Sequence, residues 1–312
     1  MEFGLNEDQE AFRDTVRTFA RGKLAPGYLE RAKSERFPWD AHREVAALGV
    51  FGLLAGGEFS PLDHEDYVAA GLVVEELAYA DFNLANAAIP VLLMSSLIAR
   101  HGQDELRRDW LPGLVGGDTY VALGLTEPGT GSDVTAIRTT ATATADGYVL
   151  RGEKTSVTML AHAAAIIVVA QTVRDGEPAG VSAFLVPLDA PGIMKSPISD
   201  TGWRPLGRGV LHLDDVPEAA RLLCYSALWH RTVNRKHTAL AAMTKWYGPL
   251  HASQAIHDCL LLHGNFGYSS EYPFEQRLRD VLAVEIADGT AQIQKIIIAR
   301  ELYGRQFIPY GR

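Results

Sequence analysis

A short loop of glycine, proline and hydroxyl residues is the part of the chain whose residue types point most directly to chemistry. It covers residues 125–133, with the sequence LTEPGTGSD. Proline and two glycines impose an irregular backbone that can bring N–H groups close to a ligand. Three hydroxyls add short donors, which suits a carbonyl-rich ring or a phosphate. A glycine-rich loop is weak evidence by itself, so composition alone favours a simple turn stabilised by Asp and Ser side chains.

A second polar segment, residues 284–294, contains Asp288-Gly289-Thr290 followed by Gln292. Taken together, in this order and at about this separation, the two segments resemble the flavin-site segments of the acyl-CoA dehydrogenase family. Residues 151–158 resemble the family's next flavin strand, and residues 263–273 resemble its glycine-rich loop before the last helices. The resemblance covers nearly the whole chain.

The resemblance implies that the chain binds FAD. Thr126 would bond the pyrimidine end of the isoalloxazine, and Ser132 would face the pyrophosphate. Thr158 matches the hydroxyl residue at flavin N5, where hydride arrives. The C-terminal residues that the resemblance assigns to the cofactor are Gly264, Thr290 and Gln292, and no metal site is predicted.

Ser156 departs from the family pattern. It falls where many members place a tryptophan against the flavin ring. A stacking aromatic contributes about 1 kcal/mol beyond the area that it buries. We therefore expect the flavin to be held less tightly here than in members that keep the aromatic residue.

Asp288 is the predicted catalytic base. In the best-known members the matching residue is a glutamate, which removes the proton α to the thioester while hydride leaves the β carbon for flavin N5. A backbone N–H at the base and a ribityl hydroxyl polarise the thioester carbonyl. Aspartate is one methylene shorter, and nitroalkane oxidase, a relative, is similar in using Asp at this place. The alternative interpretation is that Asp288 only caps the final helix, because Asp is a good N-cap residue.

A segment of the family pattern is missing after Leu223. The family would continue through two long antiparallel helices, whereas residues 224–246 resemble the end of the second helix and the start of the next. Those helices complete a C-terminal bundle, line the acyl pocket and build the tetramer interface in the family. Their loss would expose an apolar face, with Leu240, Met243, Tyr247 and Leu250 as its candidates, and such a face calls for a partner.

The hydrophobic pattern predicts an α+β protein in the order helical, β, helical. Residues 1–118 repeat apolar residues at helical spacing, with Asn6 and Gln9 as a capping box and Gly102 as a stop signal. Residues 119–218 are dense in Thr, Val and Ile, with a hairpin turn at Asp146-Gly147 and a last strand at 209–213. Residues 219–312 return to helical spacing. We predict a central β domain, a small barrel or sandwich, between an N-terminal helical domain and a shortened C-terminal helical bundle.

Composition limits the classes of function. The chain has 312 residues and a formal net charge of −9, which argues against nucleic-acid binding because a phosphate backbone needs a basic face. Two cysteines make no disulfide framework, so a reducing cytoplasm is expected. The apolar runs 163–170 and 296–299 are too short to span a bilayer, and no membrane association is predicted.

These observations predict a shortened, FAD-dependent dehydrogenase that desaturates an acyl-CoA or acyl-carrier-protein thioester between its α and β carbons. The electron acceptor, a flavoprotein or oxygen, stays open. A homo-oligomer or a complex with a related chain is expected. The alternatives are a non-catalytic, accessory member that acts as partner subunit or scaffold, and a flavin oxidase or monooxygenase of the same family.

Overall fold

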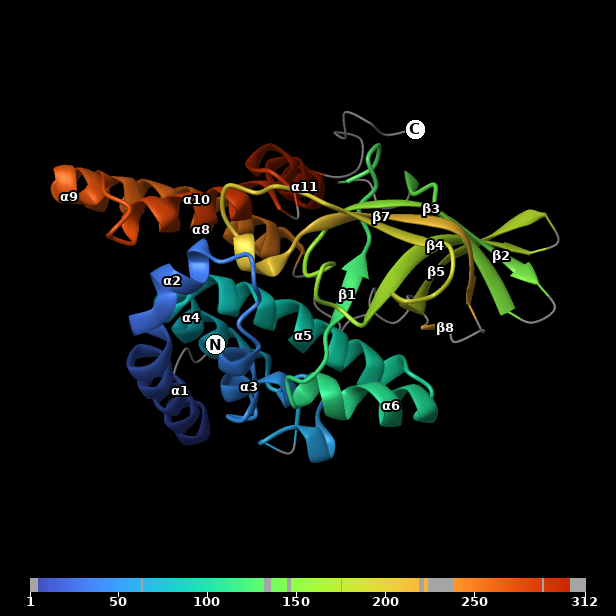
Figure 1. The fold of residues 1–312 in the computed structure, drawn as a ribbon, viewed down its shortest axis with the longest axis horizontal. Helices are drawn as coiled ribbons and strands as arrows, with labels where there is room; N and C mark the ends of the chain where they lie inside the picture. The colour runs from blue at the N-terminus through green and yellow to red at the C-terminus, as the bar shows by residue number, and fades with distance from the viewer. Residues whose placement is uncertain are drawn as a thin grey trace. The chain divides into compact units, whose positions relative to one another are not determined.

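The computed structural model describes residues 5–62, 64–131, 136–144, 147–174, 176–218, 222–223, 238–287 and 289–303 (Figure 1). The chain divides into two compact units. The first contains Met1–Gly129 and Thr135–His230, and the second contains Thr130–Val134 and Arg231–Arg312. The predicted order of helices, sheet and helices is confirmed.

The first unit begins with short helices. The predicted capping box is present, since the Asn6 side chain accepts from the Gln9 amide while the Gln9 side chain accepts from the Asn6 amide. Val16 is fully buried on the inner face of the helix that follows. The elements are α1 (Glu7–Phe19), η1 (Ala20–Leu24), η2 (Ala25–Gly27), α2 (Tyr28–Lys33), α3 (Trp39–Ala46), η3 (Val50–Gly52) and η4 (Gly57–Phe59).

Three longer helices follow, α4 (Tyr67–Ala80), α5 (Phe82–His101) and α6 (Asp104–Val115). Asp66 and Asp81 accept backbone N–H groups at the starts of α4 and α5, which satisfies donors that a helix leaves unpaired at its first turn. Gly102 ends α5 as predicted. α5 is long and apolar enough to cross a membrane, although the sequence alone did not identify it as such a stretch. In the structure, however, 67% of its most apolar window is buried. It is therefore the core helix of this unit.

The described strands form one curved, eight-stranded sheet in the order β6-β7-β3-β2-β4-β5-β8, with β1 paired to β4 (Figure 1). Most neighbours are antiparallel, and β1 and β2 run parallel to β4. The strands are β1 (Val121–Gly124), β2 (Thr140–Thr144), β3 (Gly147–Val157), β4 (Ala165–Arg174), β5 (Glu177–Pro187), β6 (Ile193–Pro197), β7 (Gly209–Glu218) and β8 (Leu222–Leu223), with η6 (Arg204–Leu206) before β7.

Two predictions about strands have different outcomes. β2 and β3 pair antiparallel from Thr144↔Gly147 onward, which confirms the predicted hairpin, although Asp146 lies outside the described residues. The prediction that residues 209–213 form the last strand is wrong, because β8 follows and pairs with β5. A two-residue strand is too short to leave a periodic pattern.

The helices and the sheet of the first unit share one core. Met94, Leu97 and Ile98 of α5 pack with α6 and with residues of β1, β4 and β5. The Tyr120 hydroxyl, fully buried, donates to the Ala87 carbonyl of α5 at 3.1 Å. The sheet edge that carries the candidate loop is therefore supported from behind by a packed helical layer.

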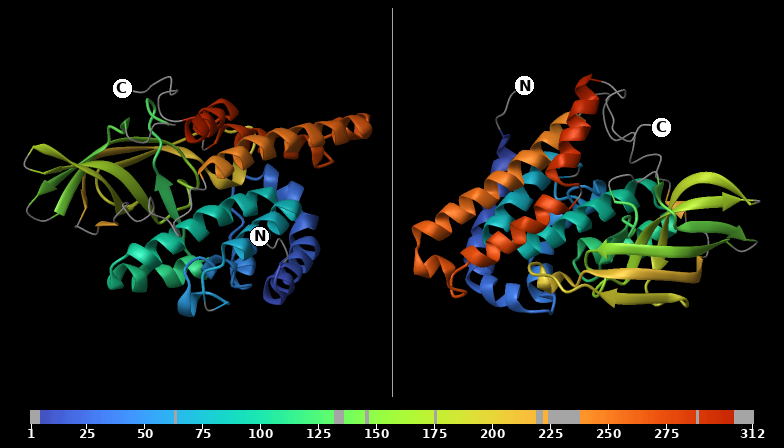
Figure 2. Two further views of the ribbon diagram at one scale, coloured as in Figure 1. Left: turned by 180° about the vertical axis from the view of Figure 1, so that it is seen from behind. Right: turned by 90° about the horizontal axis from the view of Figure 1, so that it is seen from above.

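The second unit is helical where it is described. It contains α8 (Thr238–Leu262), α9 (Asn265–Tyr268), α10 (Phe274–Ile286) and α11 (Ala291–Tyr303). α8 packs along both α10 and α11 (Figure 2). Of the predicted apolar stripe on α8, Leu250 is 45% exposed, and the side chains of Leu240, Met243 and Tyr247 lie outside the description.

Candidate functional site

The loop that follows β1 is fastened to β3. The Thr155 amide donates to the Thr126 carbonyl at 2.8 Å, and the Lys154 ammonium donates to the Leu125 carbonyl at 3.2 Å. The loop therefore runs along the end of β3 with its backbone held at two successive residues.

A buried ion pair lies beneath this loop. Lys154 Nζ is 2.7 Å from Glu127 Oε1, and the two side chains are 0% and 6% exposed. Glu127 also accepts from the amides of Arg138, at 2.7 Å, and Thr139, at 2.9 Å. One carboxylate thus joins the loop, β3 and the start of β2.

The pKa of Glu127 shows that this carboxylate stays ionised. Burial acts to raise the pKa, but hydrogen bonds from Lys154, from Thr139 and from the Arg138 amide outweigh burial and lower the pKa to about 2. A carboxylate that accepts several hydrogen bonds behaves in this way. Burial lowers the pKa of Lys154, and the hydrogen bond to Glu127 opposes that change.

The predicted hydroxyl contacts on this side are positioned by the same support. Thr126 belongs to the fastened loop, Thr158 follows the end of β3 directly, and both are half-buried. Ser132 lies outside the described residues. Half-buried hydroxyls on a rigid backbone can donate to the polar edge of a planar, carbonyl-rich ring, so the described residues are compatible with FAD.

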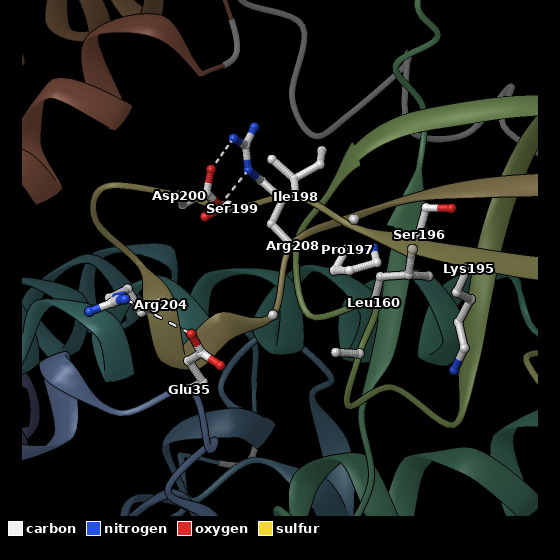
Figure 3. A pocket seen from close by; sticks show the side chains of 13 residues that line it. Glu35, Leu160, Lys195, Ser196, Pro197, Ile198, Ser199, Asp200, Arg204 and Arg208 are labelled. Atoms are coloured by element: carbon white, nitrogen blue, oxygen red, sulfur yellow. Dashed lines mark hydrogen bonds and ion pairs between the residues drawn. The ribbon is translucent and has the colours of Figure 1, made fainter.

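Ser156 is exposed and tied to an arginine. Arg208 Nη1 donates to Ser156 Oγ at 2.7 Å. Arg208 Nε donates to Asp200 Oδ2 at 2.9 Å, a contact drawn in Figure 3. Ser156 has φ 59°, and two other non-glycine residues with positive φ are Met159, three positions later, with φ 64°, and Trp203 with φ 58°. Positive φ in residues with a side chain is uncommon and gathers at functional sites. An arginine that is paired with a carboxylate thus reaches the position where the family pattern expects an aromatic ring.

A cavity of about 580 Å³ opens beside this arginine. The turn after β3, at Leu160 and Ala161, forms one wall, and the segment from Lys195 to Asp200 forms another (Figure 3). Arg204 lies across it and approaches Glu35 at 3.9 Å. The cavity belongs wholly to the first unit.

The second unit carries the other predicted residues. Asp288 lies outside the described residues. Gly289 has φ 97°, Thr290 is half-buried, and Gln292 is exposed in the first turn of α11. Gln294, 5% exposed, donates from Nε2 to the Gly289 carbonyl at 3.3 Å. The turn between α10 and α11 is thus held by a side chain of α11.

Gly264 occupies the turn between α8 and α9. It has φ 55° and ψ −133° and is the N-cap residue of α9, a conformation that glycine adopts at little cost. It is exposed, and a Cβ added to it would meet nothing within 4 Å. The backbone conformation therefore explains a glycine here without any ligand.

The sequence did not single out four residues that hold these loops: Glu127, Lys154, Lys245 and Gln294. Glu127 lies within the noticed loop, but its partner is 27 positions away along the chain. Lys245 of α8 donates to the Val284 carbonyl across 39 positions. Such contacts leave no local pattern. Lys154 leaves no signal in the sequence either, because exposed and buried positions are mixed along β3.

Comparison with known proteins places each part of the chain. Residues 6–118 match the family description "Acyl-CoA dehydrogenase, N-terminal domain", residues 122–216 match its middle domain, and residues 213–303 match its C-terminal domain. The N-terminal, middle and C-terminal domain matches follow one another along the chain in that order.

Among curated proteins, a probable acyl-CoA dehydrogenase of Bacillus subtilis, YngJ, is 27% identical over 380 positions, covering 97% of this chain and all of the relative. A benzylmalonyl-CoA dehydrogenase of Aromatoleum aromaticum is 28% identical over 384 positions, covering 97% and 100%. Both alignments are longer than the 312 residues present here. The chain is therefore shorter than these relatives, although it reaches nearly to both of their ends.

The fold agrees with a solved structure. The glutaryl-CoA dehydrogenase of Mycobacterium smegmatis, solved in complex with FADH2, superposes with a TM-score of 0.84 at 23% identity, covering 98% of this chain and 97% of that one. The order of the matched domains, the full-length alignments and the shared fold lead to one conclusion: this chain belongs to the acyl-CoA dehydrogenase family and is a shortened member of it.

Proposed function

We propose that the protein is an FAD-dependent dehydrogenase that forms a double bond between the α and β carbons of an acyl thioester. The observation that carries the proposal is the buried Lys154–Glu127 pair, which fastens the hydroxyl-bearing loop to the strand that leads to Thr158. A buried ion pair lowers the stability of the fold unless additional hydrogen bonds compensate for the loss of solvation. Rigid support of this kind is what a bound, planar cofactor requires.

In this proposal the residues that contact FAD are Thr126, Ser132, Thr158, Gly264, Thr290 and Gln292. Bound FAD would supply the two-electron acceptor for the hydride that leaves the β carbon. The Asp288 carboxylate takes the α proton, and the electron pair of that C–H bond becomes the new double bond. The products are the α,β-unsaturated thioester and the reduced cofactor.

An aspartate base constrains the substrate. A reacting distance of about 3–3.5 Å tolerates little error, so a carboxylate that is one methylene short needs a repositioned substrate, a smaller one or a more acidic α carbon. The relatives named above include a dehydrogenase of benzylmalonyl-CoA, whose name specifies a branched acyl group. We propose an acyl group whose α carbon can approach Asp288 closely, on either coenzyme A or a carrier protein.

The protein also needs partners. The second unit leaves large apolar side chains exposed, among them Leu261, Leu262 and Phe266 at 61%, 85% and 63%. Large exposed apolar side chains favour association. We propose a homo-oligomer or a complex with a related chain.

Anaerobic mixing of the purified protein with a panel of acyl-CoA thioesters tests the proposal. The parent is expected to lose its flavin absorbance with at least one of them. Asp288→Asn is expected to keep the flavin and lose this bleaching, and Asp288→Glu is expected to retain part of it. If Asp288→Asn bleaches as fast as the parent, Asp288 is not the base. A colourless protein that takes up no FAD would instead favour the accessory role.

A further inference from the structure

Lys245 of α8 reaches the turn between α10 and α11. Its Nζ donates to the carbonyl oxygen of Val284 at 2.6 Å and lies 3.5 Å from the carbonyl oxygen of Gly289. These carbonyls belong to residues on opposite sides of position 288 in the chain. One half-buried side chain from a different helix therefore contacts both ends of the turn.

The contact with Val284 has a clear electrostatic reason. Val284 belongs to the last turn of α10, which ends at Ile286. Carbonyls in the last turn of a helix lack intrahelical partners and carry partial negative charge. An ammonium that donates there makes a charge-assisted hydrogen bond, which is about twice as strong as a neutral one.

The Gly289 carbonyl is held from a second direction. Gln294 Nε2 donates to it at 3.3 Å, and Gln294 is 5% exposed. Gly289 has φ 97°, and a Cβ at this position would lie 2.9 Å from the same Nε2. The turn therefore has a conformation that only glycine adopts readily, fixed by side chains from α8 and from α11.

We infer that Lys245 is a positioning residue that holds the carbonyls of Val284 and Gly289, which flank the proposed base Asp288 in the chain. The inference rests on the proposed function, in which that carboxylate removes the α proton. Because a misplacement of about 1 Å can cost about 10²-fold in rate, a short base depends strongly on the turn that carries it. Lys245 acts on this turn and not on the substrate.

Hydrogen exchange tests the structural part of the inference without any ligand. In Lys245→Met, amides in a peptide covering residues 284–291 are expected to exchange at least about tenfold faster. A hydrogen bond to a charged group contributes about 1.5–3 kcal/mol, and each 1.4 kcal/mol corresponds to a factor of about ten. Lys245→Arg is expected to restore part of the protection, and Lys245→Gln serves as a second variant if Lys245→Met fails to fold. Lys295→Met is the matched control, because Lys295 is exposed and its Nζ lies 4.6 Å above the Trp246 ring. Exchange at the parent's rate in a folded Lys245→Met protein would overturn the inference.

Anaerobic flavin reduction by an acyl-CoA substrate tests the functional part. Lys245→Met is expected to lower kcat by up to about 10²-fold, with KM and flavin content within about twofold of the parent because no substrate contact is lost. Asp288→Asn is measured in parallel. If Asp288→Asn is inactive and Lys245→Met keeps the parent's kcat, the inference alone fails. If Asp288→Asn keeps the parent's rate, the proposed function fails, and the exchange experiment still decides whether Lys245 holds the turn.

Discussion

At the scale of single residues, the candidate site consists of side chains that could contact a ligand and side chains that hold the loop in place. The sequence points to the Thr126 hydroxyl through the glycine-rich loop and to the Thr158 hydroxyl only through the resemblance to the family. It gives no sign that Lys154 and Glu127 pair, because the partners belong to different elements that meet only after folding. The sequence thus suggests candidate ligand contacts, whereas the residues that hold the loop in place are found only in the structure.

Removing one partner of the buried pair tests its structural role. Lys154→Met leaves the Glu127 carboxylate buried beside two backbone amides and without its cation, which is expected to cost about 3–5 kcal/mol in the free energy of unfolding. Arg151→Met is the control. The Arg151–Asp215 pair is 67% and 50% exposed, and an exposed pair contributes less than about 1 kcal/mol. Urea melts of both variants measure the difference, and equal losses would contradict the role assigned to Lys154.

His42 gives the protein a predicted dependence on pH. Its side chain is fully buried against Phe37 and Phe51, and both ring nitrogens are without a hydrogen-bond partner among the described residues. Burial, helped by the neighbouring Arg43 charge, lowers the pKa of His42 to about 4. An unfolded histidine titrates near pH 6.5.

Between these two pH values the unfolded state binds more protons, so stability is present above pH 6.5 and is lost as pH falls towards 4. From pH 7 to pH 5 the loss assigned to His42 is about 2 kcal/mol. His42→Phe is expected to remove that part of the slope in melts at the two pH values. His257→Gln, at an exposed histidine, is expected to leave the slope unchanged, and an unchanged slope in His42→Phe would refute the assignment.

At the scale of elements, the sequence predicts what is periodic and misses what depends on tertiary contact. Three predictions are confirmed: the capping box at Asn6, the end of α5 at Gly102 and the pairing of β2 with β3. Each depends on residues that lie close together in the sequence. α5 begins at Phe82, because the Asp81 side chain accepts the amides of Asn83 and Leu84 there. β8 is invisible because its two residues pair only once β5 is in place.

A pair of glycine substitutions tests the account of these elements. Gly152 has φ 146° at a register shift in β3, and a Cβ there would lie 2.8 Å from Thr139 Cα. Gly152→Ala is therefore expected to destabilise the protein by about 2 kcal/mol. Gly71, inside α4, has nothing within 4 Å of an added Cβ, so Gly71→Ala is expected to stabilise it by about 0.5–1 kcal/mol. Thermal melts compare the two, and changes of the same sign would contradict this explanation.

At the scale of the whole molecule, the exposed apolar side chains of the second unit have the largest consequence. Leu262, Tyr268 and Ile286 of the second unit are 85%, 81% and 69% exposed, and the chain is shorter than the relatives that it matches. We predict that the protein is not a monomer. Light scattering across a range of concentrations measures the mass, and a stable monomer throughout would show that these side chains need no partner.

The central claim is that this shortened chain still binds FAD, and the flavin content of the purified protein tests it most directly. The protein is denatured, the supernatant is analysed for flavin, and the melting temperature is measured with and without added FAD. The account predicts that FAD is released and that added FAD raises the melting temperature, because a ligand that binds only the folded state stabilises it by mass action. No released flavin together with an unchanged melting temperature would contradict the account.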